Sequence, residues 1–236
     1  MSEAYESKLK QMEIWYDDLI AEENCEQLLE YDYEPHRNFL QSLRGDVLDV
    51  GGGAGLAARY LDPSVRYVVV DPLPSWGSPK WAEFARKFRS SGPEPQFVQA
   101  RGEALPFADQ GFDVVLSYWS LNHVENAAKC TSEMIRVLKR GGIARFVIED
   151  VEPSWTDLLR EAAARMWARL RSRHREAPIQ MPLKDAVRLK VQGNWPLQED
   201  HFRIVEADLF EWTGSRLRPT GRRWIGEHVA YDFLRI

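Results

Sequence analysis

A short apolar segment that runs directly into a cluster of glycines constrains the fold of this chain more than any other feature. Residues 46–50 have the length and composition of a buried strand, and glycines follow at Gly51, Gly52, Gly53 and Gly55. Glycine tolerates positive φ and lets a ligand approach the backbone without a Cβ in the way. In an open parallel sheet, ligands bind beyond the carboxyl ends of the strands. The turn is therefore predicted to cradle a nucleoside-like ligand.

The segments around this turn alternate between strand and helix patterns. Short apolar or β-branched runs predict strands at residues 46–50, 66–70, 96–99, 112–117 and 143–149. Amphipathic spacing predicts intervening helices at residues 56–61, 81–88 and 127–138, the last ending before Gly141 and Gly142. Residues 217–225 and 228–236 are predicted to pair as an antiparallel hairpin. The expected fold is α/β: a Rossmann-like, seven-stranded, mostly parallel sheet with helices on both faces and an antiparallel C-terminal hairpin.

The length of 236 residues suits one domain, 1–236, with four parts. Residues 1–44 are expected to form a helical cap, with helices at 6–30 and 35–43, and residues 45–150 the cofactor-binding core. Residues 151–205 interrupt the alternation and are predicted to be a substrate-binding or lid insertion, with a helix at 154–174 and an irregular stretch at 176–200. Residues 206–236 are expected to hold a short helix at 207–212 and the hairpin.

Composition and charge exclude several classes of protein. The net charge of −5 makes nucleic acid an improbable partner for the whole chain. Cys25 and Cys130 lie outside any metal-binding spacing, so neither a disulfide framework nor a metal is expected. The N-terminal residues do not have the pattern of a signal peptide, and no apolar run reaches the roughly 18 residues of a membrane span. We expect a cytoplasmic protein without a membrane partner.

The residues around the glycine turn narrow the identity of the ligand. A dinucleotide fingerprint would need a third glycine at the position of Leu56. Instead, Asp49 precedes the glycines by two residues, and Asp71 ends the second predicted strand. A carboxylate at this second position can accept hydrogen bonds from ribose hydroxyls, although dinucleotide enzymes use one there too. The alternative role for Asp71 is to form the turn before Pro72.

Three segments carry a resemblance to a known family. The pattern Asp-x-Gly-x-Gly-x-Gly at residues 49–55 resembles motif I of class I S-adenosylmethionine-dependent methyltransferases. Residues 101–117 resemble that family's stretch from the third to the fourth strand, and Leu138-Lys139-Arg140-Gly141-Gly142 resembles its turn before the fifth strand. The chain is thus similar to the broad group called methyltransferase type 11.

The resemblance implies S-adenosyl-L-methionine as cofactor and assigns residues to it. The expected cofactor-binding residues are Asp49, Gly51, Gly53, Gly55, Asp71, Pro72, Arg101, Gly102, Glu103, Ser117 and Tyr118. Arg101 departs from the family, because many relatives have an aspartate there that accepts a hydrogen bond from adenine, and arginine has no acceptor. Adenine recognition is then expected from the backbone around Gly102 and from Glu103, with Arg101 stacked on adenine or pointing to solvent.

Candidate catalytic and substrate residues follow from the chemistry of methyl transfer. An acceptor hydroxyl must lose a proton, and imidazole titrates near neutral pH, so His123 and His201 are candidate general bases. The alternative for His123 is to support the next helix. Tyr16, Trp119 and Trp195 are candidate substrate-binding residues. For Tyr16 the alternative is core packing, and for the aromatic C-terminal segment it is a homodimer interface.

The predicted function is methyl transfer to a small organic molecule, with a hydroxyl oxygen as the first expectation and nitrogen as the second. The stretch 117–123 lacks the prolines of enzymes that methylate exocyclic amines of bases or glutamine. An RNA or protein methyltransferase remains an alternative, to which a cluster of arginines could contribute: Arg165, Arg169, Arg171, Arg173 and Arg175. A third reading is a protein that binds S-adenosylmethionine without transferring its methyl group.

Overall fold

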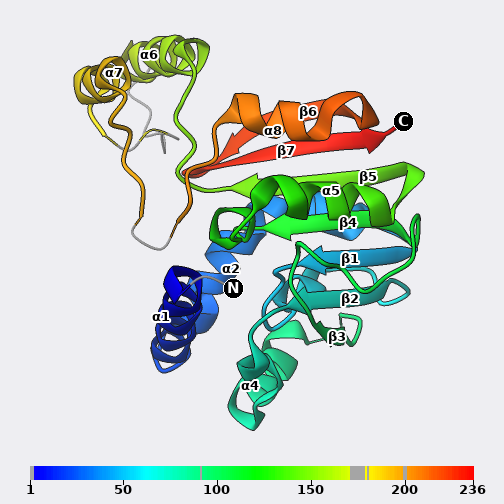
Figure 1. The fold of residues 1–236 in the computed structure, drawn as a ribbon. Coiled ribbons are helices and arrows are strands. Elements are labelled where there is room, and N and C mark those ends of the chain that lie inside the picture. The colour runs from blue at the N-terminus through cyan, green and yellow to red at the C-terminus, as the bar shows by residue number, and fades with distance from the viewer. Residues whose placement is uncertain (1–2, 91, 171–178, 180, 199–200) are drawn as a thin grey trace.

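A seven-stranded sheet organises the computed structural model, which describes residues 3–90, 92–170, 179, 181–198 and 201–236 (Figure 1). The strand order is β3-β2-β1-β4-β5-β7-β6. The strands are β1 (Asp46–Val50), β2 (Arg66–Asp71), β3 (Gln96–Gln99), β4 (Phe112–Tyr118), β5 (Leu138–Ile148), β6 (Leu217–Ile225) and β7 (His228–Arg235). Neighbours among the first five strands pair in parallel, and β7 is antiparallel to both β5 and β6. The predicted fold class is confirmed.

The central strands are apolar on both sides because layers of helices cover both faces of the sheet. Val47 and Leu48, which are consecutive and therefore face opposite sides, are both fully buried. The strand order reverses between β1 and β4, since β2 and β3 follow on one side and β5 on the other. Such a reversal leaves a crevice at the carboxyl ends of the two strands, where open α/β sheets bind ligands.

The helices divide between the two faces of the sheet. Their bounds are α1 (Glu3–Leu19), α2 (Cys25–Tyr33), α3 (Arg37–Ser42), α4 (Pro79–Arg89), α5 (Ala127–Val137), α6 (Trp155–Leu170), α7 (Leu183–Gln192) and α8 (Glu206–Thr213). Short 3-10 turns occupy Glu34–His36, Leu56–Tyr60, Pro74–Gly77, Leu121–His123 and Gly214–Arg216. Side chains of α2, α3 and α4 share one core with β1 and β2, and side chains of α5 and α8 share the other.

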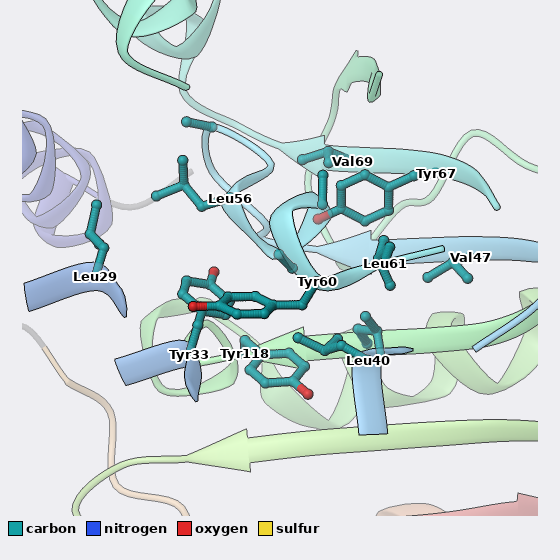
Figure 2. Close-up of a cluster of buried hydrophobic side chains, with 14 of the residues drawn as sticks. Leu29, Tyr33, Leu40, Val47, Leu56, Tyr60, Leu61, Tyr67, Val69 and Tyr118 are labelled. Atoms are coloured by element: carbon teal, nitrogen blue, oxygen red, sulfur yellow. The ribbon is translucent and has the colours of Figure 1, made fainter. Parts of the chain in front are cut away.

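The first of these cores is rich in tyrosine. Figure 2 shows Tyr33 of α2 lying beside Tyr60 and Tyr118, with Leu40 of α3 nearby. The ring of Tyr33 stacks on both other rings at 6.1 Å between centroids. This packing fixes α2 against the carboxyl end of β4, which is where the functional residues follow.

Three secondary-structure predictions were wrong. The helix expected at 6–30 is two helices, because Glu22, Glu23 and Asn24 offer no apolar side chain to continue the buried face. The stretch 176–200 is not irregular throughout: α7 begins after Pro182 and ends at Gly193, whose φ of +67° suits a helix C-terminus. Strand β5 begins at Leu138, not residue 143, and the expected glycine turn is an irregularity within it, with Gly141 at φ +76°.

Helices α6 and α7 stand apart from the sheet, on the side where the parallel strands end (Figure 1). They pack on each other through Leu158 and Ala186, with Trp195 partly buried against them. Arg222 of β6 pairs with Asp157 of α6 and so links this unit to the sheet. The predicted helix 154–174 is confirmed as far as residue 170, and the rest lies outside the described residues. Among the described helices, none is long and apolar enough to cross a membrane.

Candidate functional site

A cavity opens at the carboxyl ends of β1, β2 and β4, at the crevice that the strand order predicts. Its empty volume, including the mouth that is open to solvent, is about 540 Å³. The residues that line it are Tyr5, Leu9, Met12, Tyr16, Val50, Gly51, Val70, Asp71, Pro72, Leu73, Trp76, Gly102, Trp119, Ser120, His123 and Val124. Seven predicted site residues are thereby brought together: Tyr16, Gly51, Asp71, Pro72, Gly102, Trp119 and His123.

The glycine turn forms one wall of the cavity. Gly51 has φ +73°, and a Cβ there would lie 2.3 Å from the Cβ of Ser120. Its amide donates to the Val70 carbonyl at 2.7 Å, which holds the turn against the end of β2. Gly53 and Gly55 do not line the cavity; a Cβ on Gly55 would meet Pro95 and Val69, so this glycine serves the packing of the turn.

Two aspartates lie at the turn in different environments. Asp71 lines the cavity, and its carboxylate accepts from the amides of Gly53 at 3.1 Å and Leu73 at 3.0 Å. Asp49 lies beneath the turn, is 1% exposed and accepts from the Tyr67 hydroxyl at 2.6 Å. Burial raises the pKa of Asp49 to about 6 and also raises the pKa of Asp71. Among the described residues, Asp49 Oδ1 has no hydrogen-bond partner.

The segment after β3 places Arg101 and Glu103 behind the cavity wall. Arg101 pairs with Glu103 and Glu125, each at 2.9 Å, and its guanidinium lies over the ring of Tyr5. Glu103 is 5% exposed and also accepts from the Asn126 amide. Arg101 is thus engaged in ion pairs, which differs from both orientations expected from the sequence. Gly102 reaches the cavity itself, and a Cβ there would lie 2.5 Å from the Cys130 Sγ.

The end of β4 turns sharply into the cavity. The side chains of Ser117 and Tyr118 are buried and do not line it. Trp119 has φ +53°, a strained value for a bulky residue, and its ring faces the cavity beside Ser120. The Ser120 hydroxyl donates to the Val50 carbonyl at 2.6 Å, joining the ends of β4 and β1.

One face of α1 covers the cavity, and the sequence reading found only part of it. Tyr5, Leu9, Met12 and Tyr16 all line the cavity and follow helical spacing. Tyr16 packs edge-on against Trp76 at 4.7 Å between ring centroids. Tyr5 precedes Leu9 by four residues, so the helical spacing could have predicted that it lines the same face of α1.

The two candidate histidines meet at the inner end of the cavity. Their rings lie 4.5 Å apart between centroids, and both Nε2 atoms approach Oε2 of Glu149, at 3.7 Å for His123 and 3.5 Å for His201. His123 lines the cavity, whereas His201 is buried behind it. Neither Glu149 nor its role was predicted, although it directly follows β5, at the same edge of the sheet as His123.

Trp195 does not join this group. Its side chain packs against the core that α6 and α7 share, and it does not line the cavity. Its assignment to the substrate stays a prediction.

Comparison with known proteins identifies the domain that carries this cavity. Residues 48–146 match the family model described as a methyltransferase domain. This segment of the chain is therefore a methyltransferase domain. An uncharacterized methyltransferase of Mycobacterium leprae (strain Br4923) is 40% identical over 103 residues, which cover 41% of this chain and 34% of that protein. The chain therefore spans about a third of the length of this curated relative.

Solved structures show that the methyltransferase fold extends beyond the matched segment. A S-adenosylmethionine-dependent methyltransferase of Thermotoga maritima, described as a possible histamine N-methyltransferase, aligns over all of both chains with 17% identity and a TM-score of 0.55. The 1,6-didemethyltoxoflavin-N1-methyltransferase of Burkholderia thailandensis aligns over 98% of this chain and 84% of its own, with 15% identity and a TM-score of 0.57. That structure contains S-adenosylhomocysteine, the product of the cofactor of this class.

The residues of the methyltransferase domain fit S-adenosylmethionine. Asp71 presents a carboxylate at the end of β2, where a ribose would place its hydroxyls. Gly51 and Gly102 give the ligand close access to backbone. Asp49 does not line the cavity; its buried Oδ1, which has no partner among the described residues, lies beneath the turn that the cofactor would contact. These residues would hold the cofactor at the reversal of the sheet.

Proposed function

We propose that this chain catalyses methyl transfer from S-adenosylmethionine to a hydroxyl oxygen of a small organic molecule. When bound, the cofactor supplies an activated methyl group, so the protein must position the acceptor and relieve it of a proton. The observation that carries the proposal is His123, which lines the cavity and has Glu149 and His201 behind it. This cluster is the described group of titratable side chains best placed to remove a proton from an acceptor.

The shape of the cavity favours a small acceptor. Aromatic side chains line it from three directions, with Tyr5 and Tyr16 on α1, Trp76 after β2, and Trp119 after β4. Such a covered apolar pocket, with few polar groups, suits an organic molecule. The Burkholderia thailandensis structure reported above, which holds 1,6-didemethyltoxoflavin, is consistent with this class of acceptor.

An RNA or protein acceptor is less well supported. It would require an exposed basic surface beside the cavity. Of the arginines clustered in the sequence, Arg165 is occupied by Glu161 and by the carbonyls of Ile179 and Met181. Arg171, Arg173 and Arg175 lie outside the described residues, so they favour neither a small-molecule acceptor nor an RNA or protein acceptor.

We favour oxygen over nitrogen as the acceptor atom because of how each acceptor loses its proton. A neutral amine can attack before it loses its proton, whereas an alcohol or phenol needs a base. His123, which lines the cavity and packs on the buried His201, is placed to act as that base. Nitrogen is the second candidate, because the Burkholderia thailandensis enzyme is named for an N1 atom.

Turnover assays on matched acceptors test the proposal. The chain is incubated with S-adenosylmethionine and pairs of aromatic acceptors that differ only in carrying a hydroxyl or an amine, and S-adenosylhomocysteine is quantified by mass spectrometry. We expect product with hydroxyl acceptors and a loss of about 10²–10⁴-fold in turnover for His123→Ala. Product only with amines would show that the acceptor atom is nitrogen and not oxygen. Cofactor binding without product from any small acceptor or RNA would favour a binding protein without transfer activity.

A further inference from the structure

Three potential metal ligands meet behind the cavity from separate parts of the chain. His123 ends the 3-10 turn after β4, Glu149 directly follows β5, and His201 precedes α8. One ligand atom from each lies within 4.8 Å of the others. We propose that His123, Glu149 and His201 form a binding site for one divalent transition-metal ion, such as Zn²⁺.

The spacing of these atoms suits coordination of a single ion. Two ligands bound at about 2.1 Å with a tetrahedral angle between them lie about 3.4 Å apart. Oε2 of Glu149 lies 3.5 Å from His201 Nε2 and 3.7 Å from His123 Nε2. The rings are nearly perpendicular, at 87°, and their close packing brings both edges to the same carboxylate oxygen. Small side-chain movements therefore suffice to close the three groups on an ion.

Asp150 orients His201 for this role. Its Oδ2 lies 2.7 Å from His201 Nδ1, the ring nitrogen that would not bind the metal. Metal-binding histidines commonly donate their second nitrogen to a carboxylate, which fixes the tautomer and leaves the other nitrogen free to coordinate. The contact between Asp150 and His201 Nδ1 thus matches that of a residue that supports a metal ligand.

Asn122 holds the three ligand-bearing segments together. It is 1% exposed, and its side chain hydrogen-bonds to both the amide and the carbonyl of Glu149. The same side chain reaches the Phe202 carbonyl at 3.4 Å, while the Asn122 carbonyl accepts from the Phe202 amide at 2.7 Å. The neighbours of all three ligands are therefore fixed before any ion binds, which lowers the entropic cost of assembling the site.

The ligand types indicate which ions would bind. Two imidazoles and one carboxylate suit Zn²⁺ and Fe²⁺, and three protein ligands leave positions open for water or substrate. Mg²⁺ and Ca²⁺ prefer oxygen ligands throughout and should compete poorly. Neither Cys25 nor Cys130 belongs to the cluster, so the coordination shell should contain no sulfur.

The position of the site suggests its use, and this step rests on the proposed function. His123 is both a ligand and part of the cavity wall, so an ion bound to it would lie next to the acceptor. A hydroxyl that occupies an open position on such an ion has a lowered pKa and releases its proton to water. A nitrogen lone pair committed to a metal cannot also take up a proton, so the ion would replace His123 as the means of deprotonation.

Metal binding can be measured without any turnover. Tag-free protein is stripped with a chelator, checked for folding by circular dichroism and titrated with Zn²⁺ against a competing indicator, with and without excess Mg²⁺. We expect a single equivalent to bind, unaffected by Mg²⁺. Glu149→Gln and His201→Ala should each weaken binding by more than about 100-fold and Asp150→Asn by about 10–100-fold. Glu152→Gln, which removes a nearby carboxylate that pairs with Lys190, should leave affinity unchanged. X-ray absorption of the zinc-loaded protein should show two imidazoles and no sulfur.

Several results would overturn the site: no saturable zinc binding by folded protein, equal binding by Glu149→Gln, or a sulfur ligand. S-adenosylmethionine binding is measured on the same metal-free preparation, which separates the two proposals. Cofactor binding without metal binding overturns the metal site and leaves the methyltransferase proposal standing. Metal binding without cofactor binding overturns the methyltransferase proposal and leaves the metal site standing. If metal-free protein methylates a hydroxyl acceptor as fast as the zinc-loaded form, the ion has no role in deprotonation.

Discussion

The Gly53 amide donates a hydrogen bond to Oδ2 of Asp71 at 3.1 Å, which joins the glycine turn after β1 to the end of β2. Asp71 also lines the cavity, so one carboxylate shapes the turn and faces the ligand. Each of its oxygens has two lone pairs, so the internal hydrogen bonds leave capacity for ribose hydroxyls. This double role makes Asp71 the most informative position for testing cofactor binding.

Substitution of Asp71 by alanine should weaken S-adenosylmethionine binding by at least about 10-fold. Hydrogen bonds to a charged group contribute about 1.5–3 kcal/mol each, and the variant loses both the ligand contacts and the support of the turn. Asp71→Asn retains one acceptor oxygen and should lose less. Isothermal titration calorimetry provides the measurement, with Asp62→Ala as control, because Asp62 caps an exposed turn through Ser64. Unchanged affinity in Asp71→Ala would show that this carboxylate does not hold the cofactor.

Replacement of Gly51 by alanine should destabilise the protein and block the cavity. A left-handed conformation costs a non-glycine residue about 1–2 kcal/mol, and the new Cβ would also overlap Ser120. Gly193→Ala is the matched control, because Gly193 has φ +67° with no atom near a new Cβ. Urea unfolding should show a larger loss of unfolding free energy for Gly51→Ala than for Gly193→Ala. Equal losses would mean that the turn can move away from Ser120.

The sequence revealed the core of the domain better than its periphery, for physical reasons. The central strands β1, β2 and β4 each contain a short apolar run, and Asp49, Asp71 and the glycines lie at or just after strand ends, which the fold brings to one edge. Glu149 was missed although it follows β5 at that same edge. Helix α7 was missed because the prolines of the segment 176–200 favoured an irregular structure, whereas Pro182 directly precedes the helix and Gly193 directly follows it. The engagement of Arg101 with Glu125, 24 residues away, depends on tertiary contacts that spacing does not encode.

The buried His36 should make stability depend on pH. Burial lowers the pKa of His36 to about 3 from 6.5, with the nearby Arg145 as a further cause. The unfolded chain therefore takes up a proton that the folded protein excludes, so stability is lost as pH falls below about 6.5 toward 3. At pH 5 this loss is about 2 kcal/mol relative to pH 8. His36→Phe should remove this pH-dependent loss of unfolding free energy. When the pH is lowered from 8 to 5, the variant should therefore become more stable relative to wild type. A difference that is equal at both pH values would contradict the assigned burial.

The ion pair that joins α6 to the sheet should matter for stability. Both oxygens of Asp157 accept from Arg222, at 2.9 and 2.8 Å, and the Asp157 side chain is 5% exposed. Arg222→Met leaves the buried Asp157 carboxylate with only Ser154 as a donor and also removes the partner of Glu206, so it should lower the unfolding free energy by up to about 3 kcal/mol, since Arg222 itself is partly exposed. The double variant Arg222→Met, Asp157→Leu should recover much of this loss. Arg218→Met, an exposed change on the same strand, should have little effect in the same urea titration; a comparable loss there would rule out the ion pair as the cause.

Calorimetric titration of the folded, tag-free chain with S-adenosylmethionine tests the central claim most directly. The cavity at the ends of β1, β2 and β4 predicts saturable binding of one molecule per chain, with competition by S-adenosylhomocysteine. A folded chain that takes up neither compound would contradict the assignment of this cavity to the cofactor.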